Sequence, residues 1–221
     1  MRDHPIPNVT EPFQYRAIGV VRGVYRPEGD EKFTRGVLID KDGQEIDSVV
    51  LGRVIALMRR HLIVDNPHLW VVYPRCREAG HLHLQIAGVW EPSTLSKTPE
   101  NATTIIDLES NKETNDFDEL PEGDDYFSIR GELIYTRPEN KELVIKVRQR
   151  ARHNTKKPLP FKLILEGEMP VDCLRNFVSL NIRRKNKKLV LEDYELIGSI
   201  PLKGSQKKRK VSLEKNKLDK T

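Results

Sequence analysis

The chain of 221 residues is long enough for one large domain, or for two of about 100 residues each with modest cores. No run approaches the roughly 20 apolar residues of a membrane helix, and the first residues lack the basic start and apolar core of a signal peptide. The two cysteines, Cys76 and Cys173, cannot supply a disulfide framework, so we expect buried thiols in a reducing compartment. A cytoplasmic protein without a membrane partner is expected, with the nucleus or an organellar stroma as alternatives.

Charge is distributed unevenly along the chain, although the net value is only +5. Residues 1–95 carry 12 basic and 12 acidic side chains, and residues 96–125 carry 2 and 10, a net of −8. Residues 126–221 carry 24 and 11, a net of +13. The C-terminal half is therefore expected to provide the field that attracts an anionic partner.

The first half of the sequence predicts five strands and one helix. The β-rich runs are Tyr15–Tyr25, Phe33–Ile39, Glu45–Val50, Leu69–Tyr73 and His81–Trp90. Between the third and fourth runs, apolar residues recur at helical spacing over residues 49–62, which leaves Arg53, Arg59 and Arg60 facing solvent. The predicted order is strand, strand, strand, helix, strand, strand.

The second half repeats this pattern. Shifting the sequence by 111 positions aligns YRAIGVVRGVYRPE, starting at Tyr15, with YFSIRGELIYTRPE, starting at Tyr126, without a gap. A second match lies near the ends of the halves, where Gly88 and Gly198 occupy late positions in two predicted strands. These matches predict a tandem duplication.

The predicted strands of the second copy are Tyr126–Tyr135, Leu143–Arg152, Phe161–Glu166, Phe177–Arg183 and Leu189–Ile200. In place of the helix this copy has only a short segment, Pro170–Arg175. That shortening is its main departure from the first copy.

The order of elements resembles the OB-fold, a five-stranded Greek-key barrel with a helix between strands three and four. The resemblance implies a mainly β protein with two tandem OB-like barrels, at 13–92 and 126–202, and binding of nucleic acid on strands two and three. Residues 1–12 form an N-terminal extension. An acidic flexible linker (93–125) and a lysine-rich disordered tail (203–221) are expected from their composition.

A basic strand face is the most specific local feature. Lys146, Arg148, Arg150 and Arg152 alternate along the second strand of barrel 2, so period-2 geometry places all four cations on one face. Four like charges on one face repel each other unless an anion lies across them. We expect that anion to be RNA or single-stranded DNA, and the alternative is a solvated face that discourages edge pairing.

Further residues extend the predicted surface. The additional cations are Lys156, Lys157, Lys162, Arg183, Arg184, Lys185, Lys187 and Lys188, and the candidate stacking residues are Tyr126, Phe127, Tyr135 and Tyr194. A base stacked on an aromatic ring contributes about 1–3 kcal/mol. The alternative for each aromatic residue is a place in the core.

Barrel 1 could form a secondary groove, although its net charge is zero. Its candidate residues are Arg16, Arg22, Arg26, Arg35, Tyr25, Phe33, Trp70, Tyr73 and Trp90. The two tryptophans, at strand ends, are more typical of a core or a protein interface than of a groove. Barrel 1 is therefore expected to bind a protein partner or to extend the footprint of barrel 2.

Two hypotheses concern the connecting segments. The acidic linker either competes with nucleic acid for the basic surface or is a plain tether. The cluster Lys207–Lys210 in the tail adds phosphate contacts, acts as an import signal, or only solvates the chain.

No enzyme motif is present in the sequence, and most of the carboxylates outside the barrels fall in the linker. Cys76, His81 and His83 lack a second Cys or His pair at zinc spacing, so no metal and no cofactor are expected, nor a small-molecule ligand. We predict a non-enzymatic RNA- or single-stranded-DNA-binding accessory protein. The alternative is a protein-interaction adaptor within a ribosomal, transcription or recombination complex.

Overall fold

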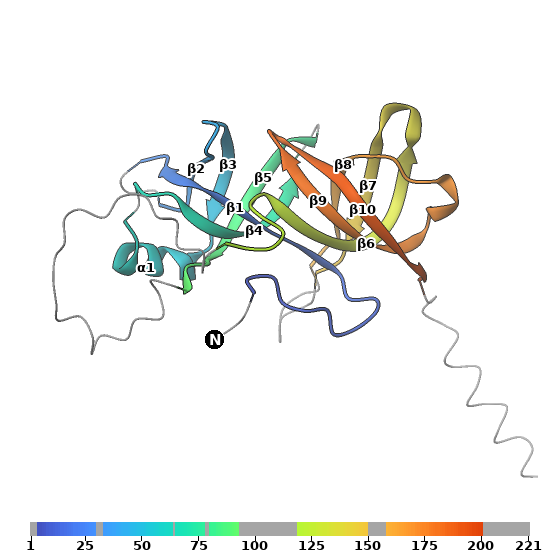
Figure 1. Ribbon diagram of the computed structural model, residues 1–221, viewed down its shortest axis with the longest axis horizontal. Coiled ribbons are helices and arrows are strands. Elements are labelled where there is room, and N and C mark those ends of the chain that lie inside the picture. Colours follow the sequence, from blue (N-terminus) through green and yellow to red (C-terminus); the bar gives the residue numbers. More distant parts are fainter. Residues whose placement is uncertain are drawn as a thin grey trace, which may run out of the picture.

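The computed structural model of the chain describes residues 4–29, 33–63, 65–77, 80–92, 119–149 and 158–200. Two barrels lie side by side in it (Figure 1). In the first, the strands are β1 (Arg16–Pro27), β2 (Arg35–Ile39), β3 (Glu45–Val50), β4 (His68–Cys76) and β5 (Leu82–Val89). They close in the order β1-β2-β3-β5-β4-β1, with only the β3–β5 pair parallel. This is the OB-fold topology.

The second barrel has the same topology. Its elements are β6 (Tyr126–Arg137), the 3₁₀ turn η4 (Pro138–Asn140), β7 (Glu142–Val147), β8 (Phe161–Glu166), the 3₁₀ turn η5 (Val171–Cys173), β9 (Asn176–Lys185) and β10 (Lys188–Ser199). The closing order is β6-β7-β8-β10-β9-β6, again with one parallel pair, β8–β10. The expected duplication of barrels is confirmed.

Barrel 1 contains the predicted helix, and barrel 2 has only a short turn at the equivalent position, as the sequence predicts. Helix α1 (Gly52–His61) buries Val54 and Met58, one turn apart, and exposes the three predicted arginines. In the second barrel the equivalent position holds only η5, whose Cys173 is buried. The strand predicted for Leu143–Arg152 is too long, because β7 ends at Val147 and the chain leaves the sheet at Arg148.

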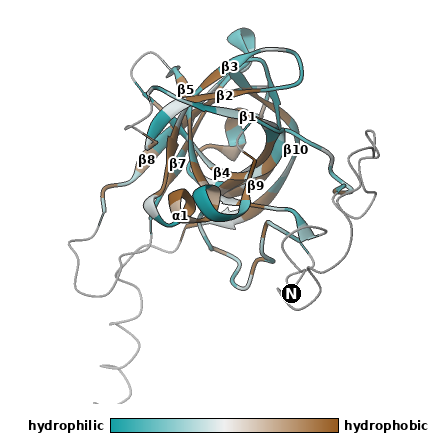
Figure 2. Cartoon of the chain, turned by 90° about the vertical axis from the view of Figure 1, so that its left-hand side faces the viewer, coloured by the Kyte–Doolittle hydropathy of each residue, from teal (hydrophilic) through white to brown (hydrophobic). Residues whose placement is uncertain are grey.

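The barrel interiors hold the apolar side chains that alternate along each strand. Figure 2, viewed along the barrels, shows hydrophobic segments lining the ring of strands and α1 near one end. Tyr25 and Trp70, predicted as groove residues, are fully buried, with ring centroids 6.3 Å apart. The Trp70 indole donates a hydrogen bond to the Gly23 carbonyl at 2.8 Å. Both residues are therefore core residues and cannot stack on a ligand.

The two barrels share one sheet. Strand β1 pairs antiparallel with β6, from Arg16 opposite Arg130 to Gly19 opposite Phe127, so all ten strands are continuous. A Cβ atom on Gly19 would lie 2.2 Å from the Phe127 ring, which is fully buried. Only glycine allows this approach of the strands.

A buried ion cluster also joins the barrels. The Arg184 guanidinium of β9, 2% exposed, bonds Asp40 of barrel 1 at 2.8 Å and Asp125 at 2.7 Å. Asp125 and Asp124 belong to the predicted linker, but both are described in the structure, and Asp124 pairs with Arg22 at 2.9 Å. The folded part of the second half therefore begins before residue 126, while residues 93–118 lie outside the described part.

Candidate nucleic-acid interface

The described cations of the predicted basic strand face, Lys146 and Arg148, are paired with a carboxylate of the protein itself. The Glu132 carboxylate on β6 accepts hydrogen bonds from Lys146 at 3.2 Å and from the Tyr15 hydroxyl, and it forms an ion pair with Arg148 at 2.6 Å. Burial alone would raise the pKa of Glu132, but these three donors hold it below its ordinary value. Lys146 and Arg148 thus share one internal carboxylate, which offsets one of their two positive charges. Arg150 and Arg152 lie outside the described residues, as do Lys156 and Lys157.

Barrel 1 packs against the strand face that the sequence analysis assigned to nucleic acid. The backbone N–H of Ile164 on β8 lies 3.5 Å from the Cys76 thiol on β4. A Cβ atom on Gly80 would lie 3.2 Å from the Ile164 side chain, so barrel 1 approaches β8 there as well. Lys162 remains exposed beside them, with no carboxylate partner among the described residues. The usual OB-fold binding face of barrel 2 is therefore partly covered.

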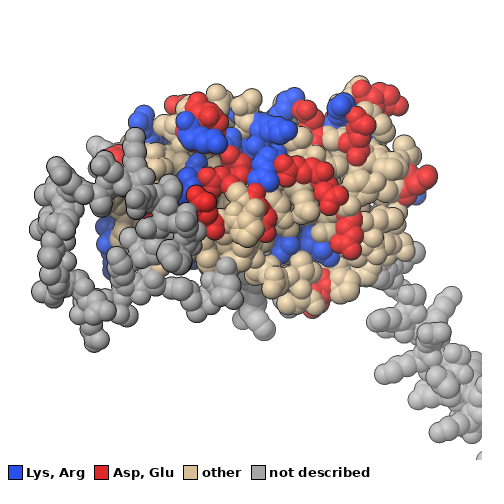
Figure 3. Space-filling model, viewed as in Figure 1, with Lys and Arg blue, Asp and Glu red and all other residues tan. Residues whose placement is uncertain are grey.

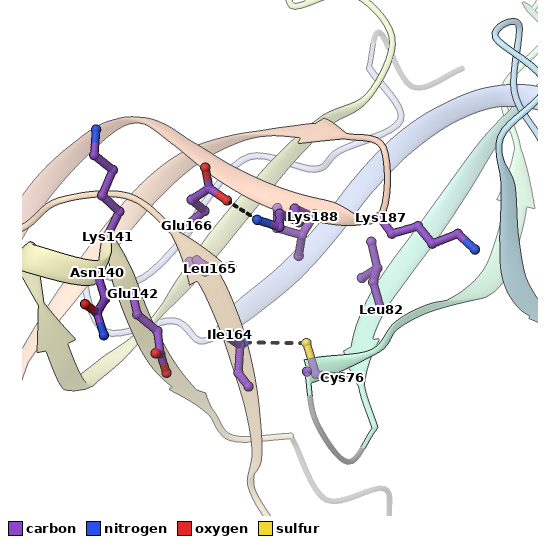
Figure 4. Close-up of a pocket in the computed structure, with 12 residues that line it drawn as sticks. Cys76, Leu82, Asn140, Lys141, Glu142, Ile164, Leu165, Glu166, Lys187 and Lys188 are labelled. Carbon is purple, nitrogen blue, oxygen red and sulfur yellow. Dashed lines mark hydrogen bonds and ion pairs between the residues drawn. The ribbon is translucent and has the colours of Figure 1, made fainter.

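The cations of the last hairpin have different environments. Arg184 is buried and Arg183 is bidentate to Glu192 at 3.0 and 3.1 Å, so the prediction that these two residues bind nucleic acid is wrong for Arg184 and untested for Arg183. Lys185, Lys187 and Lys188 are exposed. In Figure 4, Lys188 reaches Glu166 across the mouth of a cavity of about 360 Å³, at 2.8 Å, and Lys187 points away from it.

The four predicted stacking residues differ in how accessible their rings are. Phe127 is fully buried, which excludes stacking on a base. The Tyr126 hydroxyl donates to Asn181 at 2.8 Å, and its ring lies 5.8 Å from the Arg183 guanidinium. Tyr135 is half-buried. Tyr194 is exposed on β10, but its sequence neighbours Asp193 and Glu195 are acidic and exposed.

On barrel 1, the β2–β3 face carries mixed charge. Arg26 and Arg35 line a cavity of about 300 Å³ together with the acidic residues Glu28 and Asp47. Arg22, a further secondary candidate, is paired with Asp124. Figure 3 likewise shows basic and acidic side chains intermingled on the face it displays, with no broad basic area.

A different basic surface lies between the barrels, and we call it the inter-barrel groove. It is a cavity of about 560 Å³ lined by the outer face of β4 and β5, the start of β1, the end of β7 and the start of β8. Its principal lining residues are Tyr15, Arg16, Tyr73, Arg75, Arg148 and Phe161. None of the described residues that line it is acidic.

Arg75 is the central cation of this groove. Its guanidinium carbon lies 3.9 Å from the centre of the Phe161 ring, on the other barrel, and its NH1 donates to the Pro74 carbonyl at 2.9 Å. No ion pair joins it to a described carboxylate. Burial lowers the pKa of Arg75, although an arginine stays charged at neutral pH.

The groove is flanked by a second arginine and extends along barrel 1. Arg16 donates to Ser128 at 2.6 Å and to the Pro7 carbonyl at 2.5 Å; burial first, and then Arg130, lower its pKa. Beyond Tyr73 the surface continues into a cavity of about 300 Å³ that includes Arg53 and Trp90. Both cavities thus have basic and aromatic side chains in their lining, although the second is mostly apolar.

Sequence reasoning placed Arg16, Tyr73, Trp90 and Arg148 in candidate sets but missed Arg75 and Phe161. A signal for Arg75 was present, since Tyr73 and Arg75 alternate with the buried residues of β4 and must face outward together. Phe161 becomes a groove residue only because barrel 2 sits beside β4.

No group of three or more histidine, cysteine, aspartate or glutamate side chains among the described residues could hold a metal ion. No helix in the described part is long and apolar enough to cross a membrane.

Comparison with known proteins assigns both barrels. Residues 17–97 match the family described as PatR RNA-binding protein, N-terminal OB-fold domain. Residues 129–198 match the family described as cyanobacterial OB-fold-like RNA-binding domain, C-terminal. No curated protein matches the chain.

Proposed function

Because the chain belongs to the tandem OB-fold RNA-binding proteins, we propose that it binds RNA in the inter-barrel groove, without catalysis. The observation that carries this proposal is Arg75, a half-buried guanidinium stacked on Phe161 with no described carboxylate beside it. Taking a cation out of water is costly unless an anion compensates it. A phosphate in the groove supplies that anion.

The other groove residues fit the same ligand. Arg16 lines the same groove as Arg75, and its Nε, like that of Arg148, is buried without a hydrogen-bond partner among the described residues. Buried donors of this kind are normally satisfied. The rings of Tyr73 and Phe161 offer faces on which unpaired bases stack.

Single-stranded RNA suits this geometry better than a duplex. Aromatic and guanidinium planes recognise bases that have left the helical stack, whereas a duplex presents phosphates and 2′-hydroxyls on its outside. Residues of both barrels line the groove, so both barrels together form the proposed binding site. We propose that Lys162 and the exposed hairpin lysines, together with the predicted cations outside the described residues, add weaker phosphate contacts.

Titration of a short fluorescent RNA tests the site. We expect salt-dependent binding, with a slope of about −0.7 per phosphate contacted. Arg75→Gln should weaken binding about tenfold, as for loss of one charge-assisted contact, and should make the slope shallower by about 0.7. The matched control is Arg35→Gln, an exposed arginine on the β2–β3 face of barrel 1.

The two variants distinguish the groove from the usual OB-fold face. A larger loss for Arg35→Gln than for Arg75→Gln would move the site to β2–β3, and absence of RNA binding near physiological salt would refute the function. A DNA strand of the same sequence, titrated in parallel, separates RNA binding from binding of any single strand.

A further inference from the structure

The outer edge of β10 is open. Strand β10 pairs with β9 from Lys188 to Ser199, but with β8 at a single position, Val190 opposite Glu166. From Glu192 to Ser199, that second edge makes no backbone hydrogen bond to any described residue. Within the described part of the chain, this edge therefore has unpaired N–H and C=O groups, interrupted by irregularities at Glu192 and Ile197, and such an edge is a template onto which another strand pairs.

Barrel 1 shows how the same edge is closed in the other copy. There β5 pairs with β3 at three positions, the Leu51 N–H bonds the Ile86 carbonyl at 3.0 Å, and α1 packs against β5. Barrel 2 has the three-residue η5 in place of α1, while β10 has 12 residues against 8 in β5. Compared with barrel 1, barrel 2 thus lacks the helix that covers this edge, and its edge strand is longer.

The side chains of the open edge separate by chemistry onto two faces. Tyr194 and Leu196, 36% and 50% exposed, lie opposite Leu180 and Val178 of β9 and share their face. Asp193 and Glu195 lie opposite Asn181 and Ser179, on the other face. One face of the edge is thus apolar and the other acidic.

We propose that this edge binds an extended segment of a partner protein in which lysine or arginine alternates with valine, isoleucine or leucine. The added strand pairs through its backbone. Its apolar side chains lie beside Tyr194 and Leu196, and its cations beside Asp193 and Glu195, because neighbouring strands align side chains of the same face.

The charges select this occupant over two others. RNA is repelled by Asp193 and Glu195, and no residue of β10 lines the inter-barrel groove, so the edge and the groove are separate surfaces. A second copy of the chain, pairing β10 with β10, would set acidic side chains against acidic side chains. Neither objection applies to a basic segment.

A fluorescent peptide of alternating lysine and valine tests the proposal on the full chain. The wild-type protein should bind it and should not bind a glutamate–valine peptide. Reversing the edge charges with Asp193→Lys and Glu195→Lys together should weaken lysine–valine binding by about tenfold or more and create binding of the glutamate–valine peptide. Both residues are exposed, so the double variant should fold, as circular dichroism will verify.

A backbone control separates strand addition from simple charge attraction. N-methylation of alternate residues along one edge of the lysine–valine peptide removes its hydrogen-bond donors and should abolish binding, whereas unchanged binding would overturn the proposal. Equal affinity of wild type and double variant would overturn it as well.

Two other occupants of the edge, a second copy of the chain and its own C-terminal segment, can be tested by experiment. Dimers that disappear in the double variant would assign the edge to a second copy, and peptide binding seen only after removal of residues 201–221 would assign it to the chain's own C-terminal segment. Either result overturns the proposal. The double variant should bind RNA as the wild type does, so failure of the peptide proposal leaves the RNA site standing, and loss of RNA binding in Arg75→Gln leaves the peptide proposal standing.

Discussion

Arg75 of barrel 1 stacks on Phe161 of barrel 2, with 3.9 Å between the guanidinium carbon and the ring centre. The contact places a cation and an aromatic face from different barrels on the same wall of the inter-barrel groove. An arginine on an aromatic ring gains about 0.5–2 kcal/mol, and its outer face remains available for a base or a phosphate. The pair therefore serves both the packing of the barrels and the proposed RNA site.

We predict that Phe161→Leu weakens RNA binding about 5- to 100-fold, because a base stacked on an aromatic ring contributes about 1–3 kcal/mol. The fold should persist, since Phe161 is only half-buried. Phe13→Leu is the matched control, because Phe13 is 36% exposed, packs on Phe177 and lies outside the groove. Fluorescence anisotropy measures both; equal losses would show that the ring supports the fold and not the ligand.

Arg184→Met should lower the free energy of unfolding by about 3–5 kcal/mol, because it leaves the Asp40 and Asp125 carboxylates buried without their cation. Lys188→Met, which breaks the exposed pair with Glu166, should leave the free energy of unfolding nearly unchanged. Urea denaturation checks the contrast. A small effect of Arg184→Met would mean that water reaches the cluster.

The same cluster predicts a dependence on pH. Burial alone would raise the pKa of Asp40, but the Gln44 and Asp42 amides and the Arg184 guanidinium hold it below its ordinary value of about 3.9. A depressed pKa stabilises the fold fully above that value, and the stabilisation disappears as the pH falls through the folded-state pKa. Unfolding measured across this acid range should therefore be steep for the wild type and flatter for Asp40→Asn.

Gly19→Ala should destabilise the protein by about 1–3 kcal/mol, because the new methyl group overlaps the Phe127 ring where β1 pairs with β6. Gly52→Ala, at the start of α1 with nothing within 4 Å of the added atom, should be neutral or slightly stabilising. Thermal denaturation of the two variants provides the test. A tolerated Gly19→Ala would show that β1 and β6 can separate without loss of stability.

The barrels themselves could be predicted because their signals are local. Alternating apolar residues, turn residues and the helical spacing of residues 49–62 each depend on a few neighbours in sequence, and the repeat shows that two copies share one topology. The shortened helix of the second copy was equally visible.

The site could not be predicted in the same way, because it depends on contacts between distant residues. Arg184 resembles a surface cation of a hairpin until Asp40, 144 positions earlier, is placed beside it. Likewise, Arg148 appears unpaired along its own strand, and its partner Glu132 comes from β6. The carboxylate that faces Lys146 and Arg148 belongs to a residue that the pattern of that strand alone does not contain.

The pairing of β1 with β6 makes the distance between the barrels independent of the segment that connects them. Residues 93–118 need not act as a spacer, so their length and composition can change without shifting Arg75 relative to Phe161. An insertion in that segment should leave the span of RNA covered by the two barrels unchanged. The backbone hydrogen bonds between β1 and β6 thus fix the separation of the two barrels.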